Sequence, residues 1–150
     1  NLTTAKVTAI DFSESALKTA KQNAKDNNVA VDFIQQDILK TDVLPDTYDI
    51  IISNPPYIRE LEKVEIQKNV LSFEPHSALF VSDDNPLLFY KKIATLATKH
   101  LSENGILFFE INQYLGKETL EMLKTTGFKK NELRKDIFEN DRMTKSAISN

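Results

Sequence analysis

The sequence contains no cysteine and no tryptophan, and its 150 residues include only 3 glycines and 2 histidines. Without cysteine there is no disulfide, no thiolate nucleophile and no cysteine-ligated zinc site. His76 and His100 are too far apart in the sequence to indicate a histidine metal site, so we expect no bound metal. No apolar run reaches the roughly 18 residues of a membrane span, and the first residues lack the layout of a signal peptide. We therefore expect a cytoplasmic protein that does not act at a membrane.

An excess of positive charge is also missing. The chain has 19 Lys and Arg against 22 Asp and Glu, which gives a formal net charge of -3. Proteins dedicated to DNA or RNA usually carry a net basic field, so we do not expect nucleic acid as a partner. The apolar fraction of 41% and the charged fraction of 27% are those of an ordinary globular domain. The length is that of one domain.

Segments with strand character alternate with segments of helical character along the chain. Strands are expected at 6–11, 29–34, 48–53, 106–111, 128–133 and 143–148. Helices are expected at 13–26, 60–70, 86–101 and 116–126. This alternation predicts an α/β fold with a mostly parallel sheet and helices on both faces. The β-branched run at 48–53 favours a central strand covered on both faces, and the last two strands favour an antiparallel hairpin at the sheet edge.

Two acidic residues follow successive strands at the end where open α/β sheets bind ligands. Asp11 ends the first strand and is suited to accept hydrogen bonds from both ribose hydroxyls of a nucleoside, or simply to cap the following turn. Asp37 follows the second strand, where its carboxylate is suited to an adenine amino group or again to a turn. Phe12 and Ile38 stand next to these acids. They are candidates to sandwich an adenine ring, or they belong to the core.

The sharpest motif is Asn54-Pro55-Pro56-Tyr57, directly after the strand expected at 48–53. The two prolines fix φ and stiffen the loop, so the Asn54 side-chain oxygen and the Pro55 carbonyl can converge as two acceptors. An NH2 group offers two N–H donors to such a pair. Accepting hydrogen bonds from both N–H groups favours a pyramidal nitrogen whose lone pair is free to attack. These hydrogen bonds strengthen as positive charge develops on that nitrogen. Tyr57 can stack on the planar group and align it.

These motifs resemble class I S-adenosylmethionine-dependent methyltransferases that modify NH2 nitrogens. They are most similar to the HemK-type protein-(glutamine-N5) methyltransferases, which act on peptide chain release factors. The similar segments, in chain order, are 7–13, 33–39, 48–58, Glu74 with Pro75, 78–80, 107–111, 127–128, and Asp136 with Asp141 and Arg142. Asn-Pro-Pro-Tyr alone also occurs in adenine-N6 methyltransferases. The segments Glu74-Pro75 and Asp141-Arg142 favour the glutamine-N5 methyltransferases over the adenine-N6 enzymes.

The resemblance implies a Rossmann-like class I methyltransferase sheet with an antiparallel C-terminal hairpin. It implies S-adenosylmethionine as the methyl donor and the glutamine of a release factor's Gly-Gly-Gln segment as the acceptor. Asn54, Pro55, Pro56 and Tyr57 are then the catalytic loop, and Glu74 joins them in binding the substrate. Asp11 and Phe12 would bind the cofactor together with Asp37, Ile38 and Asn54.

Three features of that family are missing from the sequence. They are the Gly-rich turn expected before Asp11, the first strand of the sheet, and the helical N-terminal domain that helps to hold the release factor. Asn112 also stands where the family pattern predicts a glycine. We therefore interpret residues 1–150 as an N-terminally truncated methyltransferase domain and expect this fragment to bind the cofactor weakly and to be inactive by itself. Micromolar binding of S-adenosylmethionine in isothermal titration calorimetry would refute that expectation.

Two alternatives stay open at the level of the sequence. One is an adenine-N6 DNA or RNA methyltransferase that uses the same loop, although such an enzyme must take a base out of its stack and usually has a basic surface. The other is a methyltransferase-like domain that binds a partner without catalysis, which the missing Gly-rich turn favours.

Overall fold

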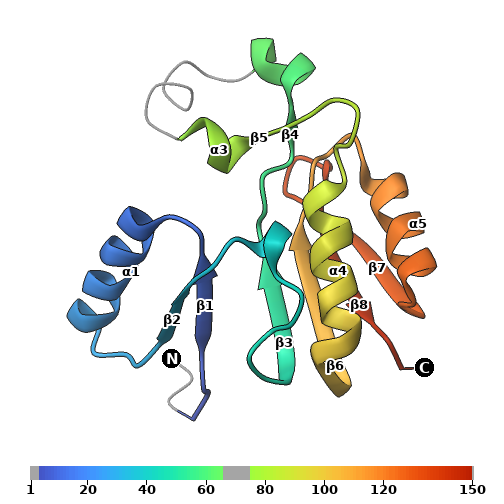
Figure 1. Cartoon of the computed structure of the whole chain (residues 1–150). Helices are drawn as coiled ribbons and strands as arrows, with labels where there is room; N and C mark the ends of the chain where they lie inside the picture. Colours follow the sequence, from blue (N-terminus) through green and yellow to red (C-terminus); the bar gives the residue numbers. More distant parts are fainter. Residues whose placement is uncertain (1–3, 66–74, 150) are drawn as a thin grey trace. The chain divides into compact units, whose positions relative to one another are not determined.

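The computed structural model describes residues 4–65 and 75–149, and their contacts divide the chain into two units. Unit 1 is Asn1–Asp42 and unit 2 is Val43–Asn150. Each unit is described by itself below (Figure 1). Within the described ranges, no helix has both the length and the apolar character needed to cross a membrane.

Unit 1 is a strand–helix–strand segment. Its elements are β1 (Thr8–Asp11), α1 (Glu14–Asp26), β2 (Asp32–Gln35) and the short 3-10 helix η1 (Ile38–Lys40). The strands β1 and β2 pair in parallel, with Asp11 opposite Gln35. Helix α1 begins after Ser13 because the Ser13 side chain accepts the Ala16 N–H at 3.3 Å. Leu17 and Ala24 are the buried residues of this helix.

Unit 2 contains a four-stranded sheet in the order β3-β6-β8-β7. Its strands are β3 (Tyr48–Ser53), β6 (Leu101–Glu110), β7 (Lys130–Lys135) and β8 (Asp141–Ala147). β3 and β6 are parallel, whereas β8 runs antiparallel to both β6 and β7. The predicted antiparallel hairpin at the C-terminal edge is therefore confirmed.

Two helices, α4 (Leu88–His100) and α5 (Gly116–Thr126), pack beside each other against this sheet (Figure 1). Alternate residues of β6 are buried, among them Leu107 and Phe109, because side chains alternate between the two faces of a strand. Tyr90 of α4 is fully buried and packs edge-on against Phe109, with ring centroids 5.1 Å apart. Helix α5 ends at Gly127, whose φ of 119° suits a residue without a Cβ. The helix expected at 116–126 is confirmed with the same bounds.

The segment between β3 and α4 differs most from the prediction. It contains β4 (Ile58–Arg59), η2 (Glu60–Glu65), α3 (His76–Leu79) and β5 (Phe80–Val81), and β4 pairs in parallel with β5. The helix expected at 60–70 is a 3-10 helix over its described part, and the remainder lies outside the described residues. Two-residue strands are missed because they carry no periodic pattern.

Strand β3 also departs from its prediction. Its β-branched run predicts burial on both faces, but Ile50 and Ile52 are 54% and 76% exposed. The prediction is wrong for this structure: Ile50 and Ile52 share one face of the strand, since side chains alternate between faces, and that face is open to solvent. Residue composition reports the propensity to form a strand, whereas burial depends on which neighbours are present.

Candidate functional site

The Asn54–Tyr57 loop lies at the carboxyl end of β3. Ser53, the last residue of β3, is paired with Phe109 of the parallel strand β6. The residues that come next, Asn54 and Glu110, therefore stand at the same end of the sheet, toward which the arrowheads of both strands point (Figure 1). This is the end at which open α/β sheets bind ligands.

Asn54 itself is exposed, and within the described residues its side chain makes no hydrogen bond. Pro55 is buried and Pro56 is half-buried, so the stiff pair anchors the loop while the Asn54 amide faces outward. The outward orientation is what a side chain that binds an external NH2 group needs. An amide turned into the protein interior would have argued against that role.

Tyr57 is half-buried, and its hydroxyl donates to Glu110 Oε1 at 2.8 Å. Burial and the Glu110 carboxylate raise the pKa of Tyr57 to about 12. The phenol is therefore neutral at physiological pH and acts as a fixed donor to Glu110. This bond holds the aromatic ring beside the loop instead of leaving it free to rotate.

The main chain of the same residue is held from the opposite side by Asn112, just beyond the end of β6. Asn112 Nδ2 donates to the Tyr57 carbonyl at 3.0 Å and to Glu62 Oε2 at 2.7 Å. The Glu62 carboxylate, in turn, accepts from the Arg59 backbone N–H at 2.9 Å and from the Arg59 guanidinium. Glu62 and Asn112 are 5% and 4% exposed, so this is a buried network whose polar groups satisfy one another.

A second layer supports the end of β6. The Tyr90 hydroxyl donates to the Glu110 carbonyl at 3.1 Å, and burial raises the pKa of Tyr90 well above the ordinary range of a tyrosine. Arg142 pairs with Asp136 at 3.4 Å, and its positive charge partly offsets the effect of Glu110 on the pKa of Tyr57. The strand end that carries Glu110 is thus fixed by the Tyr90 hydroxyl of α4.

In unit 1, the structure brings Asp11 and Phe12 to the carboxyl end of β1. Asp11 Oδ1 accepts the Ser13 N–H at 2.8 Å, so the turn-capping role suggested by the sequence is present. A carboxylate has about four acceptor positions, which leaves room for ribose hydroxyls as well. Phe12 is 55% exposed and offers an aromatic face outside the core. These two residues fit the nucleoside part of a cofactor.

Asp37 and Ile38 lie at the neighbouring strand end, because Gln36 N–H donates to the Asp11 carbonyl at 2.9 Å. Asp37 caps η1 through the Leu39 N–H at 3.0 Å and pairs with Lys40 at 3.2 Å. The Lys40 bond and the Leu39 N–H hold the pKa of the Asp37 carboxyl below its ordinary value. The carboxylate therefore stays ionised and can accept from an adenine amine, and the half-buried Ile38 offers an apolar contact.

The sequence-predicted residues therefore fall into one group in each unit, and Glu74 lies outside the described residues. The sequence did not assign a role to Glu62 or Tyr90, nor did it link Glu110 to Tyr57. Two signals were available. Glu110 ends a buried strand, and Asn112 replaces an expected glycine. Neither signal identifies the hydrogen-bond partner of Glu110 or Asn112, because these partners lie 50 or more residues away along the chain and are brought close only by the fold.

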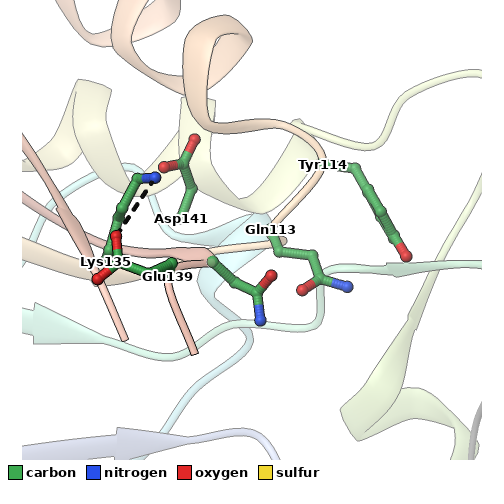
Figure 2. Close-up of a pocket in the computed structure, with 6 residues that line it drawn as sticks. Gln113, Tyr114, Lys135, Glu139 and Asp141 are labelled. Atoms are coloured by element: carbon green, nitrogen blue, oxygen red, sulfur yellow. Dashed lines mark ion pairs between the residues drawn. The ribbon is translucent and has the colours of Figure 1, made fainter. Parts of the chain in front are cut away.

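A polar hollow of about 320 Å³ lies next to the Asn112 loop in unit 2 (Figure 2). It is lined by Gln113, Tyr114, Lys135, Glu139, Asn140 and Asp141. Lys135 and Glu139 form an ion pair across it at 3.7 Å. None of the sequence-predicted site residues that the structure describes lines this hollow. In the part of the chain that the structure describes, no group of three or more His, Asp or Glu is arranged to hold a metal ion.

Comparison with known proteins gives consistent matches. Residues 1–147 match a family model described as a methyltransferase domain. The chain is 59% identical over 145 residues to a release factor glutamine methyltransferase of Flavobacterium psychrophilum, with 97% of this chain and 51% of the relative covered. A protein of the same name from Bacteroides thetaiotaomicron is 45% identical over 144 residues, covering 95% of this chain and 52% of that protein. The chain thus spans about half the length of these curated relatives.

Solved structures agree on the fold. A methyltransferase from Pyrococcus furiosus matches with a TM-score of 0.67 at 19% identity, covering 97% of this chain and 64% of that one. A ribosomal protein L11 methylase from Lactobacillus delbrueckii matches with a TM-score of 0.65 at 15% identity, covering 97% of this chain and 58% of its own length. The structural matches confirm the predicted Rossmann-like α/β class. The family model and the curated relatives confirm the resemblance drawn from the motifs.

Proposed function

Since this chain belongs to the methyltransferase domain family, we propose that the protein methylates the side-chain amide nitrogen, N5, of a glutamine in a peptide chain release factor. The acceptor is the glutamine of the Gly-Gly-Gln segment, and the methyl donor is S-adenosylmethionine. The proposal concerns the whole protein, because the chain spans about half the length of relatives named release factor glutamine methyltransferase.

The observation that carries the proposal is the exposed Asn54 amide on a proline-stiffened loop at the carboxyl end of β3. Its side chain makes no hydrogen bond within the described residues, so its oxygen is available to an incoming NH2 group. Together with the Pro55 carbonyl it supplies two acceptors for the two N–H bonds of a carboxamide. Such acceptors gain strength as positive charge develops on the nitrogen, so they stabilise the transition state more than the ground state.

Tyr57 orients the acceptor. Its ring packs on the planar carboxamide, and the 2.8 Å bond to Glu110 keeps the ring from turning away. Its pKa of about 12 keeps the phenol protonated, so Tyr57 is not the group that removes a proton at physiological pH. The N–C bond would form as the sulfur–methyl bond of the donor breaks, and the sulfur would leave as a neutral thioether. The nitrogen would then lose its proton to solvent, so the chemistry needs no strongly basic side chain.

The cofactor would be held by residues of unit 1. S-adenosylmethionine supplies an electrophilic methyl group when it is bound. The Asp11 carboxylate would accept from the ribose hydroxyls, and Asp37 would accept from the adenine amine. Phe12 and Ile38 contribute the apolar contacts to the ring. The exposure of Phe12 and the acceptor positions left on Asp11 support this assignment.

The test is a methyl-transfer assay with radiolabelled S-adenosylmethionine, the full-length protein and purified release factor. Asn54→Ala should lower kcat by about 10²–10³-fold, the cost of losing one transition-state hydrogen bond. Because the Asn54 side chain is exposed, its removal should leave the urea midpoint unchanged. Asn104→Ala is the matched control, since Asn104 is also exposed but lies toward the opposite end of β6.

The result expected is methylation of the release factor glutamine by the unmodified protein and by the Asn104 variant. A release factor whose Gly-Gly-Gln glutamine is replaced by alanine should take up no label. Transfer of the label to adenine in DNA or RNA, with none to release factor, would instead establish the adenine-N6 alternative. Equal activity of the Asn54 variant would overturn the assignment of the loop.

A further inference from the structure

We propose that Asn112 and Glu62 are positioning residues that fix the catalytic loop from behind, an inference that rests on the proposed function. Neither residue is expected to touch the substrate, since both are nearly fully buried. Asn112 holds the main chain of Tyr57, Glu62 accepts a hydrogen bond from the same Asn112 side chain, and Glu110 holds the Tyr57 hydroxyl. Glu110, the last residue of β6, and Asn112, two positions further on, therefore hold opposite ends of the same tyrosine.

Both the amide nitrogen and the amide oxygen of the Asn112 side chain are hydrogen-bonded. One amide nitrogen donates to the Tyr57 carbonyl at 3.0 Å and to Glu62 Oε2 at 2.7 Å, and the amide oxygen accepts the Tyr114 N–H at 2.9 Å. An amide is suited to this task because it carries two N–H donors and one acceptor on a single plane. Glycine has none of these groups, and alanine would leave the partly buried Tyr57 carbonyl without this donor.

Glu62 completes the arrangement by fixing the residues that follow the loop. Its carboxylate accepts from the Arg59 backbone N–H at 2.9 Å and from Arg59 Nε at 3.0 Å. The guanidinium neutralises the buried carboxylate, and Asn112 supplies a further hydrogen bond. A buried charge is tolerated only when it is paired and hydrogen-bonded in this way. Asn112, just beyond the end of β6, is thereby hydrogen-bonded to both ends of the segment from Tyr57 to Glu62.

The consequence for the reaction follows from the stiffness of the proline pair. Pro55 and Pro56 leave little freedom between Asn54 and Tyr57, so a displacement of the Tyr57 main chain moves the Asn54 amide as well. Releasing the Asn112 contact should shift the two acceptors relative to the reacting nitrogen without removing them. A misplacement of this kind lowers the rate of the chemical step more than it lowers affinity.

The experiment compares Asn112→Ala with Asn131→Ala in the full-length protein. Asn131 is the matched control because its Nδ2 also donates to a main-chain carbonyl, that of Phe128 at 2.9 Å, but it lies in β7. We expect Asn112→Ala to lower kcat by about 10–100-fold, since a misplacement of about 1 Å at the reacting group can cost about 10²-fold, with an unchanged KM for release factor. Asn131→Ala should leave both parameters unchanged.

A second measurement needs no substrate. Hydrogen–deuterium exchange read on the peptide that contains Tyr57–Glu62 should become faster in Asn112→Ala and stay unchanged in Asn131→Ala. If Asn112→Ala does not fold, Glu62→Gln disturbs the same contact from its other side and should give the same loss of kcat.

The two proposals fail in distinguishable ways. If the unmodified protein does not methylate release factor, the proposed function is wrong, while the exchange rates still decide whether Asn112 fixes the loop. The positioning role is overturned if Asn112→Ala keeps its kcat, if only KM changes, or if Asn131→Ala loses as much activity. It is also overturned if exchange over Tyr57–Glu62 is the same in all three proteins.

Discussion

Replacing Glu62 by Gln should destabilise unit 2 at neutral pH and do so less in acid. The substitution keeps the size of the side chain but removes its charge, and it places an NH2 group among donors from Arg59 and Asn112. A hydrogen bond to a charged group contributes about 1.5–3 kcal/mol, and we expect a loss in that range. With a urea m-value of about 2 kcal/mol per molar, a loss of 2 kcal/mol lowers the midpoint by roughly 1 M.

The pH dependence follows from the pKa of Glu62. Burial raises the pKa of this carboxyl, but hydrogen bonds from Arg59 and Asn112 outweigh that effect and hold the pKa below its ordinary value of 4.5. A carboxyl whose folded-state pKa is depressed contributes its full stabilisation above the unfolded-state pKa. That contribution is lost as the pH falls through the folded-state pKa. The difference between wild type and Glu62→Gln should therefore be largest at pH 7 and shrink below about pH 4.5.

The assay can observe unit 2 alone. The sequence has no tryptophan and four tyrosines, and all four tyrosines belong to unit 2. Urea unfolding followed by tyrosine fluorescence therefore reports on the unit that contains Glu62. Glu121→Gln is the control. Because Glu121 is exposed on α5, this substitution should change the free energy of unfolding by less than about 0.5 kcal/mol. A difference that is absent at pH 7, or that does not shrink in acid, would refute the reasoning.

Two further predictions concern the packing of α5. Leu123 is fully buried, so Leu123→Ala should lower the free energy of unfolding of unit 2 by about 2–5 kcal/mol, measured by urea unfolding. A loss below about 1 kcal/mol would mean that Leu123 is not packed as described. Gly127→Ala should cost about 1–2 kcal/mol, because φ is 119° there and alanine is strained in that region. An unchanged melting temperature for Gly127→Ala would contradict the left-handed backbone conformation of Gly127 at the end of α5.

Much of the local structure follows from short-range signals in the sequence. Ser13 begins α1 and Gly127 ends α5 because a side-chain acceptor and a missing Cβ act within one helical turn. The β-branched run that became β3 and the hairpin of β7 and β8 were also readable from pattern alone. The small elements between β3 and α4 were not, since pairs of two residues leave no periodicity to detect.

The candidate site divides in the same way. Asn54, the two prolines and Tyr57 are consecutive residues, so their combined chemistry can be inferred from the sequence, as can the positions of Asp11 and Asp37 after strands. What the sequence alone determined is therefore the set of groups proposed to bind a ligand and the stiffness of the Asn54–Tyr57 loop. Only the tertiary structure decided what holds that loop, because Tyr57 meets Glu110 and Asn112 across 53 and 55 residues of chain. Such contacts are set by the parallel pairing of β3 with β6, which brings distant strand ends together and is not encoded in any local pattern.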